Sequence, residues 1–269
     1  MNDLLELRIS YAVSIWRTEI GHVLSLKHII REAAKGPVEQ PTASPDALIN
    51  QSFQARSGLV KFSSALANEI DSIFDLAAPK TLQRFFEKAA KKYDGNCARV
   101  LDLTRGSIPV DSVEQIEAVD RILDPQKNSE FLANWAKKGY FVREYENFFA
   151  APTRAGLRGI VIKLEVPFSN GNFHICELQI QHVAMLDALA KSHPFFEEQR
   201  HLIDEIDPDS KEINTATAAK YVNLRETRKQ IHDDAAQAAD LNLLVKNRAY
   251  FAEDTTAKPA PAQKFDMVG

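Results

Sequence analysis

A short run of alternating residues, Cys176-Glu-Leu-Gln-Ile-Gln181, carries the clearest chemical potential in this chain. In an extended strand successive side chains point to opposite faces, so Leu178 and Ile180 share one face and Glu177 and Gln179 share the other. A carboxylate on the floor of a cleft can hold Mg²⁺ or accept a proton from an attacking hydroxyl group. The same alternation is typical of a half-exposed antiparallel strand with a polar outer face, and the pattern leaves both interpretations open.

A second carboxylate, Asp102, ends an apolar segment, Arg99-Val-Leu-Asp-Leu-Thr104, which we predict to be a strand. A single aspartate at a strand end is also a common turn residue. Phosphoryl-type transfer, however, needs Mg²⁺ held by hard carboxylate oxygens and cations placed around the phosphates. Asp102 and Glu177 on neighbouring strands would meet the first need, so we predict that both bind Mg²⁺ and act in catalysis.

Basic residues upstream would meet the second need. Lys80, Arg84 and Lys88 are spaced i, i+4, i+8, which places them along one side of a helix predicted over 80–92. A triphosphate could lie along that row, although a solvated basic helix surface would have the same spacing. Arg154 and Arg158 add cations near a predicted turn.

Composition indicates an ordinary globular protein. Hydrophobic residues make up 45% and charged residues 26% of the 269 residues, which argues against a disordered chain. The net charge of −4 gives no overall attraction to nucleic acid. Cys97 and Cys176 lie far apart and lack the spacing of a zinc or redox site. No segment approaches the roughly 18 apolar residues that span a bilayer and the N-terminus lacks a basic signal-peptide start, so we expect a cytoplasmic protein with no membrane partner.

The pattern of hydrophobic residues and prolines predicts four parts. Residues 1–45 form an amphipathic helix and a proline-containing linker, 46–206 the main domain, 207–251 a helical extension, and 252–269 a tail of disordered composition. Helices are expected over 46–76, 80–92, 113–123, 183–190 and 194–206, and strands over 99–104, 107–110, 139–151, 160–166 and 173–181, the last pair as a hairpin. This order predicts an α+β fold with a mixed sheet of about five strands flanked by helices.

The basic row and Asp102 resemble motifs of the RelA/SpoT alarmone synthetases. That family carries a basic ATP-binding helix with Lys, Ser four residues on and Lys at about eight; Lys80 and Lys88 fit this pattern and Arg84 replaces the serine. The family's next element ends in Asp-Leu followed by an arginine, which is matched by Asp102-Leu103, with Arg105 displaced by two positions.

The resemblance continues in the second half of the domain. The family's acceptor loop, of the type Lys-Asp-Tyr-x-Ala-x-Pro-Lys-x-Asn-Gly-Tyr-x-Ser-x-His, aligns without a gap from Glu146 to Val161, with Ala150, Pro152 and Gly156 as matches. The family's Glu-x-Gln-Ile strand matches the run that begins at Glu177. Residues 46–206 are therefore expected to form a RelA/SpoT-like synthetase domain with a sheet of the nucleotidyltransferase type.

The resemblance implies an enzyme that moves pyrophosphate from ATP to the 3′-hydroxyl group of a purine nucleotide with Mg²⁺ as cofactor. Asp102 and Glu177 would hold the metal, and Glu177 would also activate the acceptor hydroxyl. The expected nucleotide-binding residues are Lys80, Arg84 and Lys88 for the ATP phosphates, Arg154 and Arg158 for the acceptor phosphates, and in addition Arg105 and Gln179.

Departures from the family pattern leave the acceptor open. Leu157 replaces the tyrosine that stacks on the acceptor base, and Ala155 and Val161 replace an asparagine and a histidine. Base stacking on an aromatic ring is worth about 1–3 kcal/mol. The acceptor could therefore be a guanosine nucleotide, an adenosine nucleotide or an RNA end such as that of tRNA. A toxin or effector acting on the latter two, and an inactive interaction module, are the alternative hypotheses.

Overall fold

The computed structural model describes residues 37–124, 129–204, 215–242 and 244. The helix predicted over 3–34 and the tail predicted over 252–269 lie outside these residues. Within the described part of the chain, no helix combines the length and apolar character that crossing a bilayer requires.

The centre of the structure is a five-stranded sheet in the order β1-β2-β5-β4-β3. Its strands are β1 (Asp75–Leu76), β2 (Arg105–Val110), β3 (Phe141–Asn147), β4 (Ile160–Pro167) and β5 (Phe173–His182). β2 and β5 are parallel, whereas the other neighbours are antiparallel. The predicted hairpin is confirmed, because β4 and β5 pair continuously from Ile160 opposite Ile180 to Pro167 opposite Phe173 around a short 3-10 turn, Ser169–Gly171.

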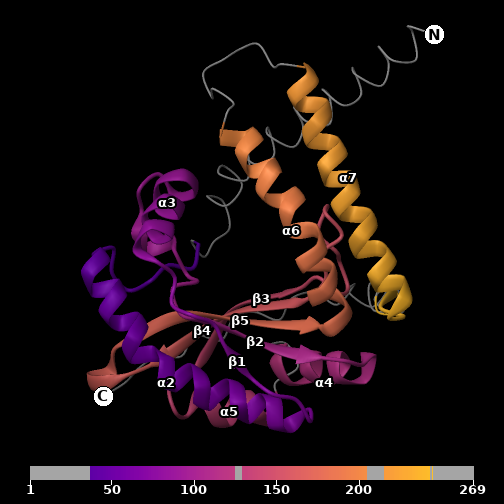
Figure 1. The fold of residues 1–269 in the computed structure, drawn as a ribbon. Helices are drawn as coiled ribbons and strands as arrows, with labels where there is room; N and C mark the ends of the chain where they lie inside the picture. The colour runs from indigo at the N-terminus through magenta and orange to yellow at the C-terminus, as the bar shows by residue number, and fades with distance from the viewer. Residues whose placement is uncertain (1–36, 125–128, 205–214, 243, 245–269) are drawn as a thin grey trace, which may run out of the picture.

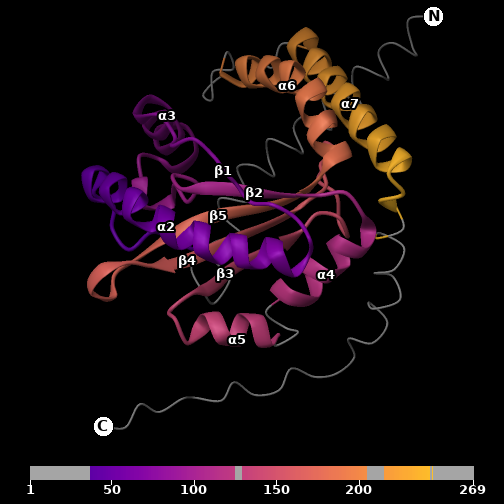
Figure 2. The same ribbon diagram turned by 60° about the horizontal axis from the view of Figure 1, so that its bottom comes forward.

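Helices lie on both sides of this sheet (Figure 1). One face is covered by α2 (Pro45–Glu69), α4 (Val113–Leu123) and α5 (Glu130–Ala136), while α3 (Leu82–Tyr93), α6 (Val183–Asp204) and α7 (Thr215–Ala238) lie on the side of the other face (Figures 1 and 2). The predicted α+β class with a mixed, helix-flanked sheet is confirmed.

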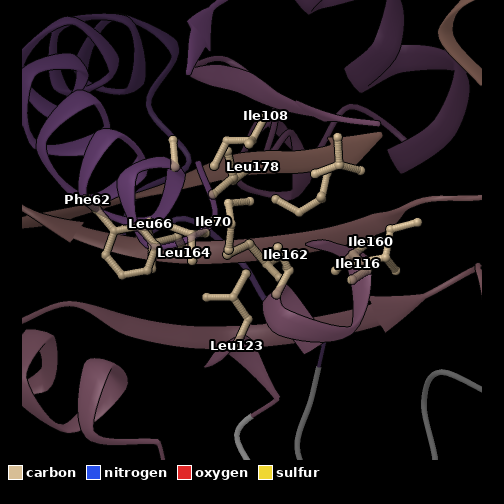
Figure 3. Packing of buried hydrophobic residues seen from close by; sticks show 14 of the residues in the cluster. Phe62, Leu66, Ile70, Ile108, Ile116, Leu123, Ile160, Ile162, Leu164 and Leu178 are labelled. Carbon is tan, nitrogen blue, oxygen red and sulfur yellow. The ribbon is translucent and has the colours of Figure 1, made fainter. Parts of the chain in front are cut away.

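The hydrophobic core lies between the sheet and α2, α4 and α5 (Figure 3). Phe62 of α2 is completely buried, and its ring contacts those of Phe131, Trp135 and Tyr140. The strands contribute every second residue to this layer, as their alternating sequences predict. The fully buried strand residues include Ile108, Ile160, Ile162, Leu164, Leu178 and Ile180.

The helix predicted over 80–92 is present but begins later than expected. Thr81 is its N-cap, with a side-chain oxygen that accepts from the amide of Arg84 at 3.3 Å, so α3 begins at Leu82 and Lys80 precedes the helix. Hydroxyl groups at the N-cap satisfy amides that have no partner in the first turn. Placing Lys80 on the helix was therefore wrong, although Lys80 still lies beside Lys88 because both bind Asp102.

Three other predicted elements differ from the structure. The helix predicted over 46–76 ends at Glu69, and Asp75–Leu76 forms the edge strand β1 instead. Residues 99–104 do not form a strand: Cys97–Arg99 is a 3-10 turn, and the chain becomes a strand only at Arg105. The helices predicted over 183–190 and 194–206 are one helix, α6, which continues through Pro194 and bends along its length (Figure 2). A proline inside a helix removes one hydrogen bond and causes a kink, which need not end the helix.

The segment predicted as a linker is fixed to the sheet by Gln40. The Gln40 side-chain amide donates to the carbonyl oxygen of Ile175 and its oxygen accepts from the Ile175 amide, both at 2.8 Å. β2 pairs with β5 only from Glu177 onward. Gln40 thus takes the place of a strand partner for Ile175, which satisfies backbone groups that burial would otherwise leave unpaired.

Candidate active site

Charged residues form a row across the face of the sheet opposite the core. Arg105 of β2 lies directly opposite Glu177 of β5 in the sheet register. Glu177 in turn lies opposite Lys163 of β4, and Lys163 lies opposite Glu144 of β3. Directly opposed residues of neighbouring strands project from the same face. The predicted division of the β5 side chains is therefore confirmed, because Leu178 lies in the core on the opposite face.

Glu177 is nearly buried in this row and is held by two side chains. Its Oε2 pairs with the Lys163 ammonium group, and its Oε1 accepts a 2.6 Å hydrogen bond from the Gln179 amide. Its backbone amide donates to the Thr104 carbonyl oxygen at 3.0 Å. That bond joins the middle of β5 to the segment before β2 that carries Asp102, so the two predicted catalytic carboxylates lie on segments that are hydrogen-bonded to each other.

Asp102 lies in the turn before β2, where two lysines meet one of its oxygens. Oδ2 is 2.7 Å from Nζ of Lys80 and 2.8 Å from Nζ of Lys88. Burial raises the pKa of Asp102, but the charges and hydrogen bonds of Lys88 and Lys80 outweigh it and bring the pKa down to about 2. Oδ1 is buried and has no hydrogen-bond partner among the described residues. Asp102 is thus an ionised carboxylate with one acceptor oxygen still to be satisfied.

The surroundings of Asp102 carry more positive than negative charge. Burial lowers the pKa of Lys80; Asp102 opposes that shift, and Lys88 and Arg105 add to it. Burial also lowers the pKa of Lys92; the charges of Lys88, Lys80 and Arg200 add to that shift, and Asp102 opposes it. Several cations around one carboxylate suit a polyphosphate, whose oxygens accept charge-assisted hydrogen bonds.

Arg84 lies on the edge of this group. Its side chain is 52% exposed and its Nη1 is 3.7 Å from Oε2 of Glu87. It lies one turn before Lys88 on α3, as the spacing predicts. Arg84 can therefore reach a ligand only from outside the buried group, and its predicted role in ATP binding stays a prediction.

The donor set is compatible with a hard divalent cation. Among the described residues no group of three or more His, Cys, Asp or Glu side chains could hold a metal by itself. Mg²⁺, however, is usually bound by one or two carboxylates together with substrate phosphates rather than by a complete protein cage. The unsatisfied Oδ1 of Asp102 fits such a ligand, and Glu177, whose amide is bonded to Thr104, stays the predicted second carboxylate.

The two arginines of the loop between β3 and β4 have different environments. Arg154 is exposed. Arg158 is only 6% exposed; its Nη2 donates to Oδ1 of Asn242 at 2.7 Å, and its Nη1 is 3.7 Å from Oδ1 of Asp233. Arg158 is directed at the α7 region, and this position does not support its predicted role in binding acceptor phosphates.

Lys163 is the site residue that sequence reasoning missed. It lies on the polar face because it is directly opposite Glu177 in the β4–β5 hairpin. The turn and the alternating pattern of the hairpin were both visible in the sequence, and together they fix the register. Extending the predicted pairing across the hairpin would have identified Lys163 as the partner of the catalytic candidate.

Comparisons with known proteins support the fold and leave the activity open. No protein-family model matches the sequence, and no curated protein matches it significantly. Small alarmone synthetase 1 from Bacillus subtilis bound to its product pppGpp matches with a TM-score of 0.50 at 13% identity, over 79% of this chain and 98% of that chain. Another structure of that synthetase matches with a TM-score of 0.50 at 15% identity, over 77% and 97%. The chain thus has a divergent form of the small alarmone synthetase fold.

Proposed function

We propose that this protein is an ATP-dependent pyrophosphotransferase with a purine nucleotide as acceptor. The observation that carries the proposal is the environment of Asp102, a buried carboxylate held ionised by Lys80 and Lys88 while the described residues leave its Oδ1 without a partner. An unsatisfied carboxylate oxygen among cations supports binding of a metal ion together with a triphosphate. The likeness in fold to small alarmone synthetases supports the same reaction class.

In the proposed reaction the 3′-oxygen of the acceptor forms a bond to the β-phosphorus of ATP. The bond between that phosphorus and the oxygen bridging to the α-phosphate breaks, and AMP leaves. Glu177 accepts the proton of the attacking hydroxyl group. Lys163 and Gln179 each bind one of its oxygens, so they hold the carboxylate on the polar face.

The cations near Asp102 position the donor nucleotide. Lys80, Lys88 and Arg105 contact the phosphates of ATP in this proposal, and their charge stabilises the charge that develops during transfer. Mg²⁺, when held by Asp102 and Glu177, would neutralise part of the phosphate charge. Because both lysines already bind Oδ2 of Asp102, their positions are fixed before the nucleotide arrives.

We expect other side chains than those of the family pattern to recognise the acceptor base. Position 157 is a half-buried leucine whose amide donates to Oγ1 of Thr153 at 3.1 Å, so no aromatic ring is available there. Phe149 is only 1% exposed and packs in the core, which leaves the half-buried Phe148 as the aromatic side chain at the start of the loop. Guanosine and adenosine nucleotides must therefore both be tested.

A product assay tests the proposal directly. The protein is incubated with ATP, Mg²⁺ and, separately, GDP, GTP, ADP, AMP or tRNA, and the products are separated by ion-exchange chromatography. We expect AMP and a pyrophosphorylated acceptor in equal amounts with at least one of them. Asp102→Asn and Glu177→Gln are each expected to lower the rate by about 10²–10³-fold, the range for losing one preorganised electrostatic contact in an active site.

Arg121→Ala is the matched control, because Arg121 is an exposed cation on α4, at the opposite face of the sheet. Its rate should equal that of the unchanged protein. If none of the acceptors yields AMP, while titration calorimetry of a non-hydrolysable ATP analogue with Mg²⁺ also detects no binding, the enzymatic proposal is wrong. Binding without transfer would instead favour an inactive nucleotide-binding module.

A further inference from the structure

The loop between β3 and β4, residues 148–159, is closed by its own hydrogen bonds. The amide of Phe148 donates to the Gly159 carbonyl oxygen at 2.7 Å, that of Gly156 donates to the Thr153 carbonyl oxygen at 2.8 Å, and that of Leu157 donates to Oγ1 of Thr153 at 3.1 Å. These bonds define the loop conformation but do not fix its position above the sheet. That position depends on what the loop contacts elsewhere.

The loop is attached to α7 through His232. Nδ1 of His232 lies 2.7 Å from the carbonyl oxygen of Ala155, and Nε2 lies 2.9 Å from Oγ of Ser192 on α6. Because a carbonyl oxygen can only accept, Nδ1 donates to Ala155, while Nε2 shares a hydrogen bond with the Ser192 hydroxyl group, which also lies 3.2 Å from the Leu189 carbonyl oxygen. One imidazole therefore joins the loop to both helices, which lie side by side (Figures 1 and 2).

This histidine and serine do not form a nucleophilic pair. Both residues are 0% exposed, and the ring nitrogen that is not paired with Ser192 is occupied by a backbone carbonyl group. A substrate could not reach the serine oxygen without separation of the helices. The His232-Asp233 dipeptide likewise has a structural environment, because Asp233 binds Lys229 and approaches Arg158.

Two further contacts fit the loop closely to α7. Gly156 has a φ of +75°, and a Cβ atom there would lie 3.1 Å from both the Lys229 carbonyl oxygen and Cβ of His232. Arg158 follows, with a hydrogen bond to Asn242 and an ion pair of 3.7 Å with Asp233. Any residue larger than glycine at 156 would require an unfavourable backbone and would push the loop away from the helix.

We propose that α7 positions the β3–β4 loop for the acceptor nucleotide, with His232 as the positioning residue. The inference rests on the proposed function, in which this loop binds the acceptor while the Lys80–Asp102–Lys88 group binds ATP. Those two regions are attached to different helices. Loosening the His232 contact should therefore weaken acceptor binding and leave ATP binding unchanged.

Two substitutions of His232 separate its two hydrogen bonds. His232→Asn retains a side-chain donor near the position of Nδ1 and should keep the bond to Ala155, whereas His232→Gln places its amide near Nε2 and should keep only the bond to Ser192. We expect His232→Gln to speed amide hydrogen exchange of Gly156 and Leu157 at least tenfold and to raise the acceptor KM at least tenfold. His232→Asn should stay within about threefold of the unchanged protein on both measures. A tenfold change corresponds to about 1.4 kcal/mol, which lies within the range for losing one hydrogen bond.

Gly156→Ala tests the same contact from the loop side and should give the same loosening, which keeps the proposal testable if His232→Gln does not fold. Gln230→Ala, at an exposed position of α7, is the matched control. The dissociation constant of an ATP analogue should stay within twofold in all variants.

Unchanged exchange of the loop amides in both His232→Gln and Gly156→Ala would refute the attachment itself. Faster exchange with an unchanged acceptor KM would refute the positioning role. If the unchanged protein transfers no pyrophosphate, the proposed function and the positioning role fail together, while the exchange measurement still decides whether α7 holds the loop.

Discussion

The two faces of the sheet are built from the same strands and differ in nearly every physical respect. On the core face Ile162 and Leu178 are completely buried under α2 and α4. On the other face Lys163 and Glu177, their neighbours in sequence, pair with each other and with further polar groups. Each strand therefore contributes alternately to stability and to the candidate chemistry.

The difference separates the expected effects of substitutions. Burial of apolar side chains stabilises the folded state in proportion to the area removed from water. Exposed charges contribute little to stability, whereas their effect on a phosphate ligand can be large. A substitution on the core face should lower the free energy of unfolding, and one among exposed cations of the other face should lower ligand affinity alone. The predictions below test this separation in order of decreasing effect on stability.

The largest effect is expected for Phe62→Ala. Phe62 is 0% exposed and lies against three other aromatic rings, so its removal leaves a large cavity. We expect a loss of about 3–5 kcal/mol, measured by urea unfolding. Phe53→Ala on the same helix is the control, because Phe53 is 55% exposed and its removal should cost well under half as much. Equal losses in the two variants would contradict the core assignment.

Gly58→Ala should give a smaller loss by overfilling the same layer. A Cβ atom at Gly58 would lie 2.5 Å from Cγ1 of Val166, so α2 or β4 must shift. Overpacking costs about 1–3 kcal/mol, and the better helix propensity of alanine returns up to about 1 kcal/mol. A net loss of about 1–2 kcal/mol is expected in urea unfolding. Asn50→Ala, at an exposed position of α2, gains the same kind of propensity without the contact and should not destabilise the protein.

The sequence predicted what depends on local pattern. The β4–β5 hairpin follows from alternation and a turn of small polar residues, and α4 has the predicted bounds, Val113–Leu123. Lys80 and Lys88 lie close together as the predicted row of cations requires, because both bind Asp102, although α3 starts after Lys80. In each of these cases neighbouring residues carry enough information.

What the sequence did not predict depends on residues far apart in the chain. Gln40 completes the pairing of Ile175, 135 positions away, and His232 binds Ala155, 77 positions away. Such contacts leave no periodic signal, because each is a single side chain meeting a backbone group. The segment 99–104 was predicted as a strand from its apolar residues, but tertiary context overrode that preference.

The pH dependence of the free energy of unfolding tests the buried environment of His174 on the core face. His174 projects toward the core, and burial lowers its pKa to about 4, below the ordinary value of about 6.5. The unfolded chain therefore binds a proton more readily than the folded protein, so the stability due to the neutral ring is complete above about pH 6.5 and is lost as the pH falls toward 4. From pH 7 to pH 5.5 we expect a loss of about 1 kcal/mol that His174→Gln abolishes. His193→Gln, at an exposed histidine, should leave the loss in place.

The smallest effect on stability and a clear effect on binding are expected for Arg105→Ala. Arg105 is exposed at the start of β2, and its charge acts on Lys80 beside Asp102. Substitutions at exposed positions usually change stability by less than about 0.5 kcal/mol, whereas losing a hydrogen bond to a charged group costs about 1.5–3 kcal/mol, or at least tenfold in affinity. Titration calorimetry of an ATP analogue with Mg²⁺ should detect this loss, and Arg121→Ala on the far side should not produce it. If Arg105→Ala binds the analogue normally, the polar face does not contact the triphosphate at β2. The two faces would then differ in their contribution to stability and not in ligand binding.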